Sequence, residues 1–333
     1  MTNDARPAPT RWFPTRSTGP VLLAALAVSG CATLGGDPGQ PLVPDRVMTR
    51  VGPFAVYTNA PIAPSAPVVS SLLELERDLA TNLGLRVAAD GPPVEVYVLK
   101  DREAFTHFLT FYYPELPPRR AFFLAQGPRR FVYTYYNDRL DEDLRHEATH
   151  ALLHAAVGDL PLWLDEGLAE YFEGPDERQG LNPEHLARLP DDVKAGWRPD
   201  LARLETLTNV REMSPRDYRE AWAWVHYLLN EPGPGRPALL AFLHDLKAQP
   251  PNPPLLADRL AKTDLAAGQR VVSHLEKLRA TPTAASTPVA ALTPKDNPTV
   301  LLQDSALETP ARGPQRRTLL GRVLGLIGMG GKP

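Results

Sequence analysis

The 333-residue sequence contains a single cysteine, Cys31, which excludes an internal disulfide and a zinc cluster built from several thiolates. Its 36 basic and 39 acidic residues give a net charge of −3, so we expect no nucleic-acid partner. The apolar run Val21–Val28 is too short to cross a bilayer. With 43% apolar and 23% charged residues, the composition excludes a coiled coil, a polytopic membrane protein and a wholly disordered chain.

The amino-terminal segment has the pattern of a secretory signal. Three arginines precede Val21–Val28, and small residues lie before Cys31. Val28-Ser29-Gly30-Cys31 resembles the lipobox of bacterial lipoproteins, which implies cleavage before Cys31 and lipidation of its sulfur. With alanine rather than aspartate at position 32, the resemblance implies the outer membrane, facing the periplasm. The alternative is a plain signal peptide in which Cys31 is coincidental.

The chain contains 37 prolines, about twice the usual share. Thr281–Gly313 is rich in threonine, proline and alanine, and we expect it not to pack. The final apolar segment could lie on a membrane surface or be a frayed tail. The predicted organisation is a signal peptide (1–30), a lipidated tether (31–49), an α/β subdomain (50–140), a helical metal-site subdomain (141–280), a disordered linker (281–315) and a short apolar tail (316–333).

Hydrophobic periodicity predicts an α+β fold, with a small sheet preceding a mostly helical half. Two segments flanking Gln126-Gly127-Pro128 indicate a hairpin. The predicted strands are Phe54–Thr58, Val94–Leu99, Ala121–Ala125 and Phe131–Tyr135, and the predicted helices before residue 141 are Val68–Leu83 and Arg102–Tyr112.

Residues His146–His150 form an HExxH pattern, which chance would produce only about 0.01 times in a chain of this composition. Histidines at positions i and i+4 share one helix face, so His146 and His150 could bind one metal ion. Glu147 borders such a site and could take a proton from a water molecule. The alternative is a histidine-rich structural helix.

A catalytic zinc site needs a third protein ligand. His154 is rejected, because histidines at i, i+4 and i+8 span about 12 Å; we expect it on the helix surface or behind the ligands. The first helix should end at Gly158 and a second should begin at Pro161 and return across it. We therefore predict Glu166 as the third ligand.

Glu170 follows Glu166 by one turn, and we expect it to hold the outer nitrogen of a ligating histidine. The alternative for this pair is a solvated acidic face, since Asp165 and Glu173 are close in sequence. Gly167 argues against that alternative, because glycine inside a helix costs about 1 kcal/mol and usually marks close packing.

The pattern His146–His150 followed by Trp163–Tyr171 resembles the gluzincin metallopeptidases and, more narrowly, the small "peptidase MA-like" bacterial group. The resemblance covers about residues 50–245 and implies a minimal zincin fold. It implies that Zn²⁺ is bound by His146, His150 and Glu166, that Glu147 is the general base, and that Glu170 orients a histidine. Fifteen residues separate His150 from Glu166, fewer than in thermolysin-like relatives, which implies a tight loop and a more open cleft.

The same resemblance implies an edge strand that pairs with the substrate and a downstream oxyanion donor. Ala121–Ala125, preceded by Arg119 and Arg120, is the candidate edge, with a hydrophobic interior strand as the equal alternative. Tyr218 is the candidate donor and His226 the second choice. For both, an ordinary core or surface helix position remains the alternative.

These observations predict a membrane-anchored, zinc-dependent peptidase that acts on a peptide or protein substrate and reaches the membrane through lipidated Cys31. The nitrogen and oxygen ligands favour zinc, although iron, cobalt or manganese can occupy similar sites. The alternative is a non-catalytic scaffold or binding lipoprotein of the cell envelope on a peptidase-like fold.

Overall fold

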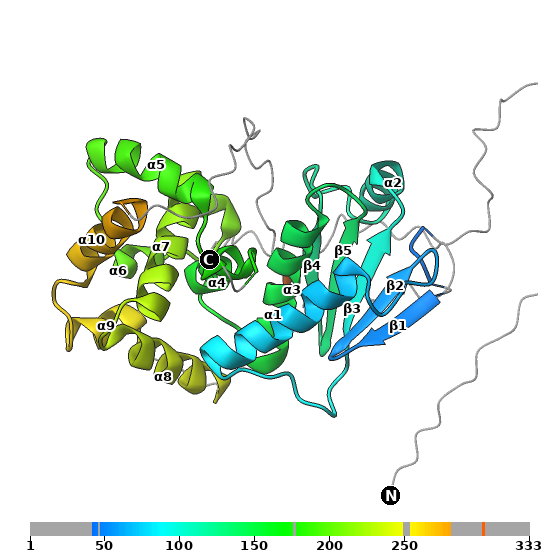
Figure 1. Cartoon of the computed structure of the whole chain (residues 1–333), viewed down its shortest axis with the longest axis horizontal. Coiled ribbons are helices and arrows are strands. Elements are labelled where there is room, and N and C mark those ends of the chain that lie inside the picture. The colour runs from blue at the N-terminus through cyan, green and yellow to red at the C-terminus, as the bar shows by residue number, and fades with distance from the viewer. Residues whose placement is uncertain (1–41, 46, 176–177, 249–253, 281–301, 304–333) are drawn as a thin grey trace, which may run out of the picture. The chain divides into compact units, whose positions relative to one another are not determined.

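The computed structural model describes residues 42–45, 47–175, 178–248, 254–280 and 302–303. Its fold is α+β, as predicted, with a mixed sheet preceding a helical half (Figure 1). None of the helices within these ranges is long and apolar enough to cross a bilayer. The predictions for Cys31, the signal peptide and the apolar tail lie outside the described residues.

The sheet has the strand order β1-β2-β3-β5-β4-β6. Strands β2, β3 and β5 run parallel to one another, whereas β1 and β4 are antiparallel to their partners β2 and β5. The strands are β1 (Val47–Val51), β2 (Phe54–Thr58), β3 (Val94–Leu99), β4 (Phe122–Gln126), β5 (Arg129–Tyr135) and β6 (Leu302–Gln303).

Two of these strands correct the predicted organisation. β1 begins at Val47 and takes the end of the predicted tether 31–49 into the sheet. β6 belongs to the segment predicted not to pack, yet it pairs in parallel with Leu124 and Ala125 of β4. Strand β4 therefore has partners on both sides over these residues and is not a free edge there, which contradicts that part of the edge-strand prediction.

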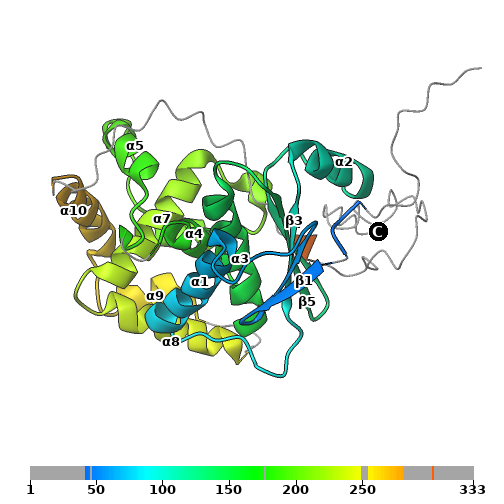
Figure 2. The same cartoon turned by 45° about the vertical axis from the view of Figure 1, so that its right-hand side comes forward.

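The β4–β5 hairpin is confirmed, and its two-residue turn contains Gly127 at φ +52°, a conformation that glycine adopts without strain. Alternate residues of β4 face opposite sides of the sheet. Phe122 joins an aromatic cluster beneath helix α2 (Arg102–Tyr112), whereas Phe123 joins the main core. Helices α1 (Pro67–Leu83) and α3 (Leu140–Ala156) cover this second face (Figure 2).

The helical half packs around a contact between α4 (Leu162–Phe172) and α7 (Pro215–Asn230). A Cβ atom on Gly167 would lie 2.7 Å from the Ala221 carbonyl oxygen, so the predicted close packing at this glycine is confirmed. The remaining helices are α5 (Pro183–Lys194), α6 (Leu201–Leu204), the 3₁₀ turn η2 (Val210–Glu212), α8 (Gly235–Lys247), α9 (Leu256–Ala261) and α10 (Ala267–Ala280).

A buried arginine fixes α3 between its neighbours. Arg145 donates to Asp78 on α1 at 2.8 Å and to the Phe172 carbonyl at the end of α4 at 2.9 Å. Its side chain is 1% exposed. Because breaking a buried ion pair typically costs about 3–5 kcal/mol, this contact holds α3 firmly against both helices at the residue before His146.

Candidate metal site

His146 and His150 lie one turn apart on α3, with their Nε2 atoms 3.3 Å apart. The helix ends before Gly158, which has φ +97°, and α4 then begins after Pro161, as the sequence predicts. This connection brings Glu166 beside the histidine pair, with its Oε2 3.8 Å from each Nε2 atom.

These three atoms form a nearly equilateral triangle that fits a metal ion. The point equidistant from atoms with these separations lies about 2.1 Å from each, and zinc binds nitrogen at 2.0–2.1 Å and oxygen at 2.0–2.2 Å. His146, His150 and Glu166 are thus a group that could hold a metal ion, as predicted. The donor set of two imidazoles and one carboxylate suits zinc but also other first-row metals.

Glu166 provides a second test of that fit. Its side chain is fully buried, and neither carboxylate oxygen has a hydrogen-bond partner among the described residues. Burial raises the pKa of Glu166 to about 8, because a charged carboxylate is costly away from water. A cation at the centre of the triangle would supply the partner that this carboxylate otherwise lacks.

The outer nitrogens of both histidines face acids. Glu173 Oε1 lies 2.8 Å from His146 Nδ1, and Asp165 Oδ1 lies 3.0 Å from His150 Nδ1. A carboxylate next to Nδ1 favours the tautomer with the proton there, which leaves the Nε2 lone pair directed at the metal position. Burial alone would lower the pKa of His146, but Glu173 outweighs it and raises that pKa to about 10.

Asp165 also contacts His154, whose Nε2 lies 2.9 Å from Oδ2. His154 is 3% exposed, so it lies behind the ligands rather than on the helix surface. Although burial opposes ionisation, His150 and His154 hold the pKa of Asp165 well below its usual range. One carboxylate therefore links two histidines of α3 to α4.

The roles of Asp165 and Glu173 were not predicted from the sequence, where these acids served only to support the alternative of a solvated acidic face. A signal for Asp165 is present: Trp163, Leu164 and Leu168 surround it, and a helix that is apolar all round is buried. An acid inside such a helix must find a partner. Asp165 is fully buried, so the solvated interpretation is wrong for this residue.

The prediction for Glu170 is contradicted. Its Oε2 accepts from Asn182 at 3.1 Å and lies 3.0 Å from His185 Nε2. The acids beside the Nδ1 atoms of the histidine pair are Glu173 and Asp165 instead. The reason is the direction of the side chain: the Glu170 carboxylate contacts Asn182 and His185 at the start of α5, whereas Glu173, three residues further along, reaches His146.

Glu147 is 1% exposed, and its Oε2 has no hydrogen-bond partner within the described ranges. Burial raises the pKa of Glu147, which makes its carboxylate a better proton acceptor. The hydroxyl of Tyr218 is also buried without a hydrogen-bond partner in the described part of the chain. Burial, followed by the charges of Glu166 and Glu170, raises the pKa of Tyr218, so its hydroxyl stays protonated and able to donate.

The second-choice donor, His226, belongs to a different cluster. Its Nδ1 lies 2.9 Å from Nε2 of His274 on α10, and burial lowers its pKa to about 3. His274 in turn contacts Glu231 at 2.8 Å. Through these contacts His226 helps to pack α7 against α10. The structure therefore does not favour His226 as the oxyanion donor.

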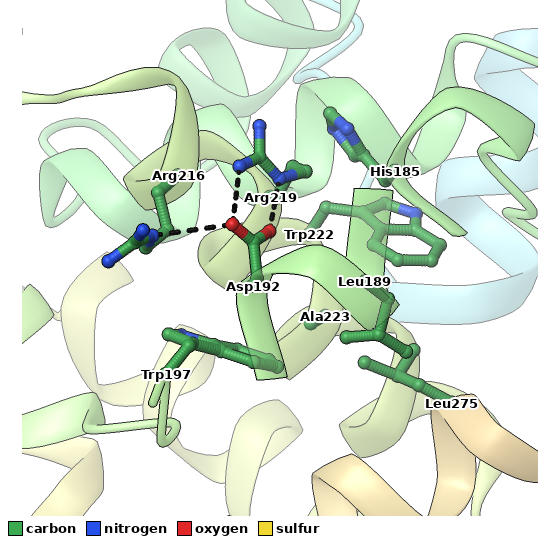
Figure 3. Close-up of a pocket in the computed structure, with 9 residues that line it drawn as sticks. All are labelled: His185, Leu189, Asp192, Trp197, Arg216, Arg219, Trp222, Ala223 and Leu275. Atoms are coloured by element: carbon green, nitrogen blue, oxygen red, sulfur yellow. Dashed lines mark hydrogen bonds and ion pairs between the residues drawn. The ribbon is translucent and has the colours of Figure 1, made fainter. Parts of the chain in front are cut away.

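A cavity elsewhere in the structure does not compete with this site. It lies between α5 and α7, and its volume of about 10 Å³ admits at most one water molecule (Figure 3). Asp192 and Arg219 close one side with two hydrogen bonds of 2.8 and 3.0 Å, and Trp197 and Trp222 contribute its aromatic walls. This small space is a feature of the packing between α5 and α7.

Comparison with known proteins adds one similarity. Residues 142–252 match a family described as "Protein of unknown function (DUF1570)". The matched segment contains the HExxH residues on α3, Glu166 on α4 and all of α7. No curated protein matches the chain.

Proposed function

We propose that this chain is a zinc-dependent peptidase, and the observation that carries the proposal is Glu147. A purely structural metal site needs ligands but no additional acid. Here a buried carboxylate, whose Oε2 has no hydrogen-bond partner in the described residues, follows directly after a candidate ligand, where a general base would stand. His146, His150 and Glu166 would hold the ion.

The chemistry assigned to the chain's own residues is hydrolysis of an amide bond. A zinc ion held by these residues would supply Lewis acidity and would lower the pKa of water at the site toward about 7. Glu147 accepts a proton from the attacking water as the carbon–oxygen bond forms, and delivers it to the amine nitrogen as the carbon–nitrogen bond breaks. Tyr218 donates its hydroxyl proton in a hydrogen bond to the developing oxyanion.

The test compares Glu147→Gln with the wild-type chain. Glutamine keeps the size of the side chain but cannot accept the proton, so we expect unchanged metal content and a loss of turnover of about 10²–10⁴-fold. Elemental analysis measures the metal content. Digestion of casein or a labelled peptide, with and without chelator, measures the turnover.

Glu170→Gln is the matched control, because Glu170 is a buried acid on the neighbouring helix that contacts Asn182 and His185. We expect it to retain both metal and activity. Equal turnover by wild type and Glu147→Gln, or turnover that chelator does not reduce, would reject a metallopeptidase and favour a scaffold or binding protein.

We further propose that the chain is a lipoprotein anchored through Cys31, with the catalytic part facing the periplasm from the outer membrane. The support is the position of Cys31 after a short apolar run. Expressed with its signal, the chain should incorporate labelled palmitate and sediment with outer-membrane fractions, whereas Cys31→Ser should do neither. Labelling of Cys31→Ser at the wild-type level would reject this anchor.

A further inference from the structure

Arg119 is a buried arginine whose terminal nitrogens lack protein partners. The residue is 8% exposed, and its Nε donates to the Pro117 carbonyl at 3.3 Å. Its Nη1 and Nη2 are both buried and have no hydrogen-bond partner among the residues that the structure describes. A guanidinium stays charged in proteins, so leaving these donors unsatisfied is costly and calls for an anion.

The neighbouring residue fixes where Arg119 lies. Arg120 makes two hydrogen bonds of 2.8 Å to Asp143, in the first turn of α3 and one turn before Glu147. The segment just before β4 is therefore tied to the helix that carries the candidate base. In agreement, the charged and polar groups that act on Arg119 are Glu147, Tyr218 and Glu166.

The balance of charge at the site favours an anionic substrate. Neither Glu147 nor Glu166 makes a hydrogen bond to Nη1 or Nη2 of Arg119 in the described part of the chain, so no direct contact with these acids compensates the guanidinium. The developing oxyanion already has a donor in Tyr218. The free edge formed by Nη1 and Nη2 matches the two oxygens of a carboxylate, the pairing that guanidinium groups make best.

We propose that Arg119 binds the free carboxylate of the substrate, so that the chain cleaves peptides close to their C-terminal end. The inference rests on the proposed peptidase function and names its substrate class. Among the charged groups, Glu147 has the largest electrostatic effect on Arg119, so we expect the carboxylate that Arg119 binds to belong to a residue near the bond that is cleaved. In the interior of a long chain, only an aspartate or glutamate side chain offers such a group, whereas every C-terminal end carries one.

The experiment uses two peptides of identical sequence, one ending in a free carboxylate and the other in an amide. Hydrogen bonds to charged groups contribute about 1.5–3 kcal/mol, so we expect kcat/KM of the wild-type chain to be about 10–100-fold higher for the acid. Arg119→Ala should lower the value for the acid to that for the amide and leave the amide unchanged. Arg119→Lys should restore part of the preference.

Arg86→Ala is the control, because this exposed arginine follows α1 and should preserve the preference of the wild type. Equal cleavage of both peptides by the wild type would overturn the proposal. A loss in Arg119→Ala that is the same for both peptides would also overturn it, since it would show that Arg119 acts on the oxyanion or on the fold.

A binding measurement separates this inference from the peptidase function itself. With the Glu147→Gln chain loaded with zinc, calorimetry should show about 10–100-fold tighter binding of the acid than of the amide. Arg119→Ala in the same background should abolish the difference. If the wild type cleaves neither peptide but this difference is present, the peptidase proposal fails and the carboxylate site stands; if the difference is absent, the carboxylate site fails.

Discussion

Each side of the histidine pair has a buried carboxylate, but the pKa values of the two carboxylates shift in opposite directions. On the outer side, Asp165 lies against the imidazoles of His150 and His154, and its pKa is lowered. On the inner side, Glu166 faces two Nε2 atoms at 3.8 Å, and burial raises its pKa to about 8. Adjacent in sequence and equally buried, these two acids differ in what surrounds their oxygens.

This difference shows how a protein prepares a site for a cation. Burial penalises both carboxylates, but paired histidine contacts compensate Asp165, whereas the inner side leaves Glu166 in need of a positive charge. The outer side therefore orients the histidines, and the inner side is the one that could hold a metal ion. Substitutions on the two sides should therefore lower zinc affinity by different amounts.

The largest effect is expected for Glu166→Ala. Loss of a ligand leaves two imidazoles for the ion, so zinc affinity should fall by more than about 1,000-fold, beyond the 10–100-fold typical of outer partners. Competition with a chromophoric chelator measures the affinity. Glu170→Ala, which removes an acid one turn further along α4, should bind zinc like the wild type. Comparable affinities for Glu166→Ala and Glu170→Ala would reject the ligand assignment.

A smaller effect is expected for Asp165→Asn on the outer side. The amide is nearly isosteric but no longer stabilises the Nδ1–H tautomer of His150, so zinc affinity should fall by about 10–100-fold. Asp191→Asn, at an exposed position of α5, is the control and should change nothing. An affinity loss for Asp165→Asn as large as that for Glu166→Ala would abolish the distinction between the two sides.

The smallest expected effect is a change with pH in how much zinc stabilises the folded chain. The metal-free folded chain holds the Glu166 proton to about pH 8, against about 4.5 when unfolded, so this contribution to stability is present at low pH and is lost as the pH rises through 8. His146, with its pKa raised to about 10, acts in the same direction. A metal ion displaces these protons, so the stabilisation it gives should grow with pH.

Melting temperatures with and without zinc, at one free zinc concentration, test this from pH 6 to 8.5. The difference in Tm should increase by several degrees across that range. Glu166→Gln carries no ionisable group at this position and should reduce the dependence to the part that His146 contributes. A difference that shrinks as the pH rises would contradict the assignment of a buried, proton-binding ligand.

Much of this site can be predicted from local spacing. The helix period places His146 and His150 on one face, Gly158 and Pro161 separate the two helices, and Gly167 marks a close contact with α7. The alternating strands and the β4–β5 hairpin follow in the same way from short-range patterns. Strand β1 was not predicted from the sequence. Its residues are largely exposed or half-buried, so its hydrophobic pattern is weak.

The sequence by itself determined which side chains could meet a metal ion, because ligand spacing on a helix is a property of a single turn. Only the tertiary structure decided which acids lie against the histidines. Asp165 and Glu173 reach the outer nitrogens of the pair through the packing of α3 against α4. Such partners come from separate segments, whose meeting depends on the whole core rather than on local periodicity.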